Sequence, residues 1–162
     1  MSTRAQQLID DLDAGEAELE AAARAAPPGI VHRRPAPDEW SVIELLAHMA
    51  NSPCFYVAEI QRLVRQGGGP FGRTLEDPGR VGPVQAHAGD SLYEAIARNR
   101  EGVAVARELL ATLSDGDLAV RGVHPRAGEY DVAGLVARFI VNHRREHARQ
   151  IREASAALTG GA

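Results

Sequence analysis

The residues best suited to chemistry in this chain are three histidines, His143, His147 and His48. His143 and His147 stand four positions apart, and residues at that spacing on a helix share a face, with Cβ atoms about 5–6 Å apart. Since imidazole binds Zn²⁺ at about 2.0–2.1 Å, two such rings can reach one ion. With His48 as a third ligand, a tetrahedral ion would keep one position open, as in a reactive rather than a structural site.

The apolar pattern around these histidines predicts that they point into the protein. His48 is in step with Leu45 and Phe55 in one helical segment, and the other two belong to the apolar stripe of another. The members of that stripe are Val132, Leu135, Val136, Phe139, His143, His147, Gln150 and Ile151. Because a buried imidazole needs a partner, we predict a divalent-metal site. The alternative is a set of core histidines that bond to protein groups.

Residues 143–147, HRREH, also match the H-x-x-E-H motif of inverted zinc peptidases. Those enzymes take their third ligand from well downstream. The one acid after His147 is Glu153, which lies on the same predicted helix. A third ligand must therefore come from upstream, which favours His48 over the peptidase interpretation.

Charged residues beside the histidines are candidates for supporting roles. Glu146 lies next to the stripe, and Glu44 lies one turn before His48, so either could act as a base or orient a metal-binding imidazole through a hydrogen bond. Glu44 is equally suited to a capping box with Ser41. The last helix also carries a basic cluster, Arg144, Arg145, Arg149 and Arg152. We expect this cluster to be solvated, with Arg144 the candidate for binding a cofactor carboxylate.

The remaining reactive side chains are expected to take no part in the site. Cys54 lies six positions after His48, which turns it away from the face of that histidine, so we expect it in the core. The histidines in predicted loops are expected to be solvated, namely His32, His87 and His124.

Four amphipathic segments predict an all-α chain with four helices. Their approximate bounds are 3–26, 41–65, 91–112 and 131–158. The predicted N-caps of the last three are Asp38 or Ser41, Ser91 and Asp131. No stretch shows sustained alternation of apolar and polar residues, so we expect no sheet.

A long connection, residues 67–90, is rich in glycine and proline and has no predicted helix. A connection of this length is unusual in a compact domain unless it is functional or a crossover. It could carry the chain along the whole bundle and leave the second and third helices parallel. Pro53, inside the second helix, is expected to kink that helix five residues past His48.

Composition narrows the class of protein. The 162 residues suit a single domain, 1–162, and the net charge of −4 gives no general attraction to nucleic acid or to an anionic membrane. The single cysteine excludes an internal disulfide framework. The chain shows no signal-peptide core and no apolar run of the ~20 residues that a membrane span needs. We therefore expect a cytoplasmic protein.

Two segments together resemble the DinB-like superfamily, whose members are also described as damage-inducible or YfiT-like metal-dependent enzymes. They are PDEWSVIELLAH at 37–48 and HRREHARQI at 143–151. The resemblance covers nearly the whole chain. It implies a four-helix bundle in up-down-down-up order, with the long crossover between the second and third helices. It also implies that His48, His143 and His147 hold one divalent ion, with Zn²⁺ or Ni²⁺ the leading choices.

The resemblance further suggests an activity. Relatives include transferases and isomerases that use low-molecular-weight thiols such as mycothiol or bacillithiol, and many relatives form homodimers. We accordingly expect a metal-dependent thiol S-transferase acting on a small-molecule substrate. Two alternatives stay open: a metal-dependent hydrolase with Glu44 or Glu146 as base, and a non-catalytic binding or stress protein on the same fold.

Overall fold

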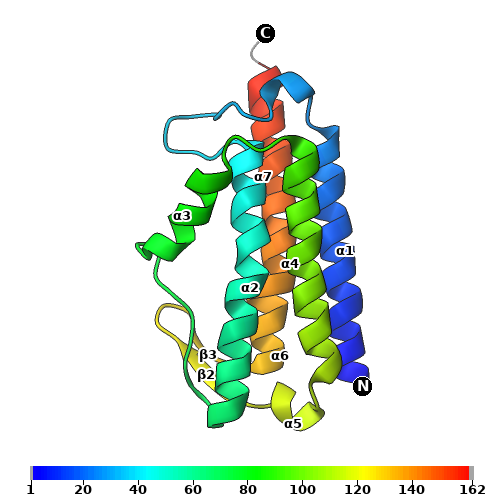
Figure 1. Cartoon of the computed structure of the whole chain (residues 1–162), viewed down its shortest axis with the longest axis vertical. Coiled ribbons are helices and arrows are strands. Elements are labelled where there is room, and N and C mark those ends of the chain that lie inside the picture. Colours follow the sequence, from blue (N-terminus) through cyan, green and yellow to red (C-terminus); the bar gives the residue numbers. More distant parts are fainter. Residues whose placement is uncertain (1, 161–162) are drawn as a thin grey trace.

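The computed structural model describes residues 2–160 and shows a bundle of four long helices (Figure 1). Three of these are α1 (Thr3–Ala25), α2 (Val42–Gln66) and α4 (Leu92–Thr112). The fourth runs through α6 (Val132–Leu135), the π-helical segment η2 (Val136–Val141) and α7 (Asn142–Thr159). Shorter helices are η1 (Pro28–Ile30), α3 (Pro78–His87) and α5 (Asp115–Leu118). The predicted four-helix bundle is confirmed.

The long helices follow an up-down-down-up order (Figure 1). α1 and the α6–α7 helix run in one direction, and α2 and α4 run together in the other. α2 and α4 are neighbours in the bundle, as are α1 and α7. This arrangement requires the chain to return along the bundle between α2 and α4, which is the role predicted for the long connection.

Side-chain caps fix where the helices begin. Ser41 accepts a hydrogen bond from the backbone of Glu44, whose carboxylate accepts one from the backbone N–H of Ser41. Ser91 and Glu94 make the same reciprocal pair at the start of α4. Such boxes satisfy amides that have no partner within the helix, so the predicted N-caps at Ser41 and Ser91 are confirmed. α2 continues as one helix through Pro53.

The crossover contains a helix that the sequence pattern did not predict, α3. Pro78 occupies its first turn, where a missing N–H costs nothing, and Asp77 caps it by accepting from the N–H of Gly79 at 2.8 Å. α3 buries only one side chain, Val84. A helix this polar and glycine-rich leaves no apolar stripe to detect.

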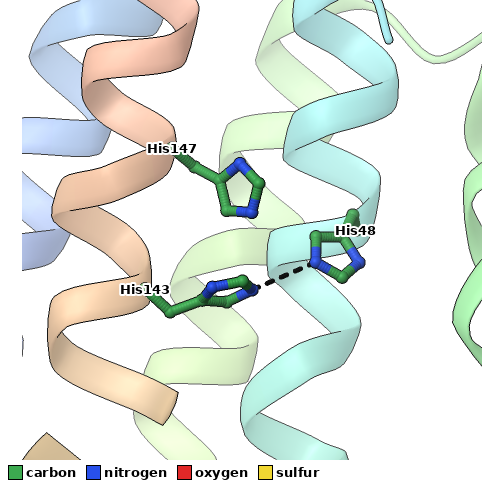
Figure 2. A group of neighbouring side chains, drawn as sticks. All are labelled: His48, His143 and His147. Atoms are coloured by element: carbon green, nitrogen blue, oxygen red, sulfur yellow. Dashed lines mark hydrogen bonds between the residues drawn. The ribbon is translucent and has the colours of Figure 1, made fainter. Parts of the chain in front are cut away.

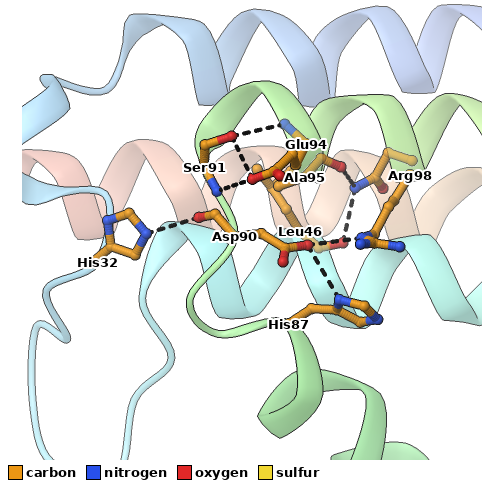
Figure 3. Close-up of polar contacts among 9 residues, drawn as sticks. His32, Leu46, His87, Asp90, Ser91, Glu94, Ala95 and Arg98 are labelled. Atoms are coloured by element: carbon orange, nitrogen blue, oxygen red, sulfur yellow. Dashed lines mark hydrogen bonds and ion pairs between the residues drawn. The ribbon is translucent and has the colours of Figure 1, made fainter.

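Asp90 ties the end of the crossover to the bundle (Figure 3). Its carboxylate accepts from Arg98 at 2.8 Å and pairs with His87 at 3.2 Å. Its carbonyl accepts from Nε2 of His32 at 2.8 Å. Three segments of the chain are thereby joined at the start of α4.

The prediction of no sheet is wrong. β1 (Gly69–Pro70) pairs in parallel with β2 (Arg121–His124), which pairs antiparallel with β3 (Gly128–Asp131). Strands of two and four residues are too short to show a sustained period of two. In β2 the two buried residues, Gly122 and His124, nevertheless alternate with two exposed ones. The hairpin covers one end of the bundle beside the crossover (Figure 1).

Two apolar clusters fill the bundle, and a polar layer lies between them. In α1 the first cluster ends at Leu12 and the second begins at Leu19, with buried Glu16 between them. Buried Asn99 of α4 and buried Arg144 of α7 likewise lie between the residues that their helices contribute to the two clusters. The histidines of α7 lie at the same level, so the candidate site belongs to this polar layer.

Candidate metal centre

The three predicted histidines converge in the middle of the bundle (Figure 2). His48 projects from α2, and His143 and His147 project toward it from α7. The Nε2 atoms of His48 and His143 lie 3.1 Å apart, and one nitrogen from each ring lies within 4.8 Å of the other two. Two nitrogens on one tetrahedral Zn²⁺ are roughly 3.3–3.4 Å apart. The cluster is therefore close to the size that one ion needs.

Burial keeps these rings unprotonated. The pKa of His48 is lowered to about 3 and the pKa of His143 to about 2. The largest cause for both is burial, and the second is the nearby His147. Burial also lowers the pKa of His147. Since a metal ion binds the unprotonated imidazole, the cluster has the protonation state that binding requires at neutral pH.

Hydrogen bonds orient the rings unequally. Gln150 Oε1 lies 2.8 Å from Nδ1 of His147, and an amide oxygen can only accept, so Nδ1 carries the proton and Nε2 keeps a free lone pair. Such a bond from the far nitrogen is the usual support of a metal-binding histidine. The buried Nδ1 of His48 has no hydrogen-bond partner among residues 2–160.

The π-helical segment η2 ends directly before Asn142 and His143. A π turn adds a residue to the helical repeat, and such turns are frequent at functional sites. It therefore sets the direction in which the following turns of α7 present their side chains. No signal in the sequence predicted it.

A cavity of about 430 Å³ opens beside His48 and His143. This volume lies within the range of small-molecule sites, about 300–1,000 Å³. Its wall includes residues from α2, the crossover, the β2–β3 hairpin and the η2–α7 helix. The polar residues of the wall that concern the chemistry are Arg73, Arg80, His124, Arg126, Arg138 and Glu146.

Comparison with known proteins identifies the family. The sequence pattern of the DinB superfamily matches residues 11–151. The chain belongs to the DinB superfamily. No curated protein sequence matches it. Within residues 2–160, no helix has both the length and the apolar character to cross a membrane.

Solved structures show the same fold at low sequence identity. YfiT from Bacillus subtilis is described as a probable metal-dependent hydrolase with an unusual four-helix bundle topology; it matches with a TM-score of 0.73 and 15% identity, over 99% of this chain and 90% of YfiT. An uncharacterised protein from Clostridium difficile 630 matches with a TM-score of 0.69 and 15% identity, over 94% of this chain and 96% of its own. Both share the fold of this chain by this measure.

In this DinB-superfamily chain, Glu44 serves the helix start rather than the histidines. Its carboxylate caps Ser41 and forms a two-pronged ion pair with Arg34. The bond to Arg34 is the main cause that lowers the pKa of Glu44. Both of its oxygens are thus engaged away from His48.

Glu146 lies where a supporting carboxylate would be useful. It lines the cavity, and Oε2 lies 3.8 Å from Nδ1 of His143. Its other oxygen pairs with Arg138 at 3.1 Å. Of the two predicted carboxylates, the structure places only this one beside the cavity.

The prediction of a solvated Arg144 is wrong. Arg144 is 0% exposed, and its guanidinium donates to Glu16 at 2.7 Å and to Asn99 at 3.3 Å. It also donates to the carbonyl of Met49 at 3.4 Å. That carbonyl lacks its usual helical donor because Pro53, four residues later, has no N–H. Arg144 therefore completes the bundle interior and lies outside the cavity wall.

Two further predictions are wrong. His124 is buried instead of solvated, because the unpredicted hairpin folds it against Phe139, with ring centroids 4.9 Å apart. Its Nδ1 lies 3.2 Å from the backbone N–H groups of Arg126 and Ala127 and accepts from them, so Nε2 carries the proton. Cys54 is exposed instead of buried, because it lines an open pocket between α2, α3 and α4.

Proposed function

We propose that this chain is a metal-dependent enzyme in which His48, His143 and His147 hold one divalent ion, with Zn²⁺ or Ni²⁺ the leading choices. The observation that carries the proposal is the convergence of three neutral imidazoles beside a cavity, with one nitrogen from each ring within 4.8 Å of the other two. When bound, such an ion would act as a Lewis acid that lowers the pKa of a thiol or of water. Three protein ligands leave a tetrahedral ion one position for such a molecule.

For the reaction, we propose transfer through a low-molecular-weight thiol of the mycothiol or bacillithiol type. A thiol becomes nucleophilic when it loses its proton, and Glu146, which lines the cavity, would receive that proton. His124, with its proton on Nε2, can donate to a substrate oxygen. The cavity volume suits a small-molecule substrate.

Hydrolysis is the second candidate. Glu146 could equally take a proton from water, and YfiT is described as a probable metal-dependent hydrolase. A thiol panel with electrophiles, run beside ester and amide substrates, separates the two. Acceleration of an electrophile by a thiol supports the transferase, whereas cleavage of an ester without any thiol effect supports the hydrolase.

Elemental analysis of untagged protein tests the metal site itself. We expect about one ion per chain in the parent and near none in His48→Ala and His143→Ala. His32→Ala, at an exposed histidine outside the cluster, is the matched control and should keep the parent's ion. A parent that binds no metal after incubation with Zn²⁺ and Ni²⁺ would refute the proposal and favour the third candidate, a binding or stress protein.

We also propose a cytoplasmic location, which rests on the absence of a recognisable signal-peptide core, and a homodimer, which rests on the family resemblance. Light scattering during size-exclusion chromatography measures the second directly. A mass near 17.3 kDa would show a monomer, and twice that value would support the dimer.

A further inference from the structure

The cavity beside the histidines carries a charge opposite to that of the chain. The net charge of the protein is −4. Four arginines nevertheless line this one cavity, Arg73, Arg80, Arg126 and Arg138. Within the described part of the chain, Glu146 is the one acid in the wall. No other acidic side chain of residues 2–160 in the wall offsets these cations.

Three of the arginines form no close ion pair, although Asp77 acts on Arg73 and Glu76 acts on Arg126 electrostatically at longer range. Glu146 pairs with Arg138 at 3.1 Å. Arg73, Arg80 and Arg126 form no ion pair within 4.0 Å among residues 2–160, whereas twelve of the eighteen arginines do. The chain therefore pairs most of its arginines and leaves these three unpaired where they share a cavity.

Aromatic rings hold two of these guanidinium groups in place. Arg73 lies 4.2 Å from the centre of the Phe55 ring, and Arg80 lies 5.1 Å from the centre of the Trp40 ring. Stacking of this kind orients a guanidinium while its N–H donors stay free. Trp40 also packs against His48, with ring centroids 5.1 Å apart. The Trp40 ring thus contacts both Arg80 and His48, which places Arg80 beside the histidine cluster.

The three arginines come from two separate parts of the fold. Arg73 and Arg80 belong to the crossover, and Arg126 belongs to the turn of the β2–β3 hairpin. A solvated face would spread cations over one surface, whereas these segments bring like charges toward one space. Unscreened like charges are unfavourable, and an anion bound between them would remove that cost.

We propose that this cavity binds the oxyanion group of a small anionic substrate, a carboxylate or a phosphate, through Arg73, Arg80 and Arg126. The planar guanidinium can donate two parallel hydrogen bonds to two oxygens of a carboxylate or a phosphate. The location next to His48 and His143 would hold the reacting part of such a molecule beside the proposed metal. The inference rests on the proposed function for the reaction, but the anion site itself needs no metal.

Isothermal titration calorimetry on the full chain tests this site with succinate and inorganic phosphate as probes. Succinamide has the same carbon skeleton as succinate without its charge and serves as the uncharged control. We expect an anion to bind the parent, and Arg73→Gln and Arg126→Gln each to weaken binding about tenfold or more, since each removes a charged hydrogen bond. Arg149→Gln, at an exposed arginine outside the cavity, should change nothing. Whichever of succinate and phosphate binds more tightly identifies the oxyanion.

The titrations are run on chelated and Zn²⁺-treated protein so that the two proposals can fail separately. Arginine-dependent binding in chelated protein supports the anion site even when no metal is bound. Metal uptake without binding of either anion overturns the anion site and leaves the metal site standing. Equal binding of succinamide, or equal weakening by Arg149→Gln, would also overturn it. Circular dichroism of each variant shows that the fold is kept.

Discussion

His143 and Arg144 are consecutive residues of α7, yet they belong to polar clusters of opposite kinds. The two outer nitrogens of Arg144 end on acceptors from three other helix positions, Glu16, Asn99 and the Met49 carbonyl. His143 meets the other rings of its cluster and a cavity. The outer nitrogens of the first cluster are paired within the chain, although the buried Nε of Arg144 has no hydrogen-bond partner among residues 2–160, whereas the second cluster brings three imidazoles together beside a cavity. Burial of polar groups alone thus does not indicate a ligand, whereas convergence of metal-binding side chains beside a cavity does.

The largest expected effect is a loss of stability when Arg144 is removed from its cluster with Glu16 and Asn99. Arg144→Ala would leave Glu16 buried without its cation, so we expect the free energy of unfolding to fall by about 3–5 kcal/mol. Urea denaturation measures this loss. Arg149→Ala, at an exposed position, should stay within about 0.5 kcal/mol of the parent. A similarly small loss for Arg144→Ala would show that its cluster does not hold the bundle together.

Apolar replacement of both partners sharpens the same comparison. Glu16→Leu combined with Arg144→Met removes both charges together and fills much of the space. We expect this double variant to recover most of the stability lost in Arg144→Ala, because an uncompensated charge costs more than an absent pair. A double variant as unstable as Arg144→Ala would contradict this.

The sequence predicted those features that depend on local chemistry. Ser41 and Ser91 fix helix starts through contacts three residues away, and four-residue spacing places His143 and His147 on one face. Periodicity also predicted that His48 would point inward. That the three rings bind metal stays a prediction.

The features that the sequence did not reveal depend on contacts between distant segments. Arg144 is buried because Glu16, 128 positions away, and a carbonyl freed by Pro53 both lie opposite it. His124 is buried because a short hairpin packs onto Phe139. A basic residue next to an apolar stripe, or a histidine between Val123 and Pro125, carries no local sequence signal of these partners. The sequence did not predict that Arg73, Arg80 and Arg126 share one cavity for the same reason, since they come from distant segments.

The next largest effect is expected on metal affinity, when the hydrogen bond that orients a ring of the histidine cluster is removed. Gln150→Ala removes the acceptor that orients His147, so we expect metal affinity to fall about 10–100-fold while the fold is retained. Competition with a chelator that reports free Zn²⁺ measures the affinity. Gln61→Ala, at an exposed glutamine of α2, is the matched control. Unchanged affinity in Gln150→Ala would show that the His147 ring is held by packing alone.

The smallest expected effect is a pH dependence of the free energy of unfolding in chelated protein. It comes from the histidine cluster, because a histidine can gain a proton in this pH range, whereas Arg144 cannot lose one. The folded state holds the pKa of His48 at about 3, whereas an unfolded histidine has a pKa of about 6.5. Below about pH 7 the unfolded chain therefore binds more protons, and stability falls as pH falls. A single histidine of this kind contributes roughly 0.7 kcal/mol of loss between pH 7 and pH 6. His48→Gln should remove that share from the parent's pH dependence in urea denaturation, whereas Arg149→Gln, which alters no group titrating in this range, should keep it. If His48→Gln loses as much stability as the parent between these two pH values, His48 is not held unprotonated by the fold, and the histidine cluster lacks the state that metal binding requires.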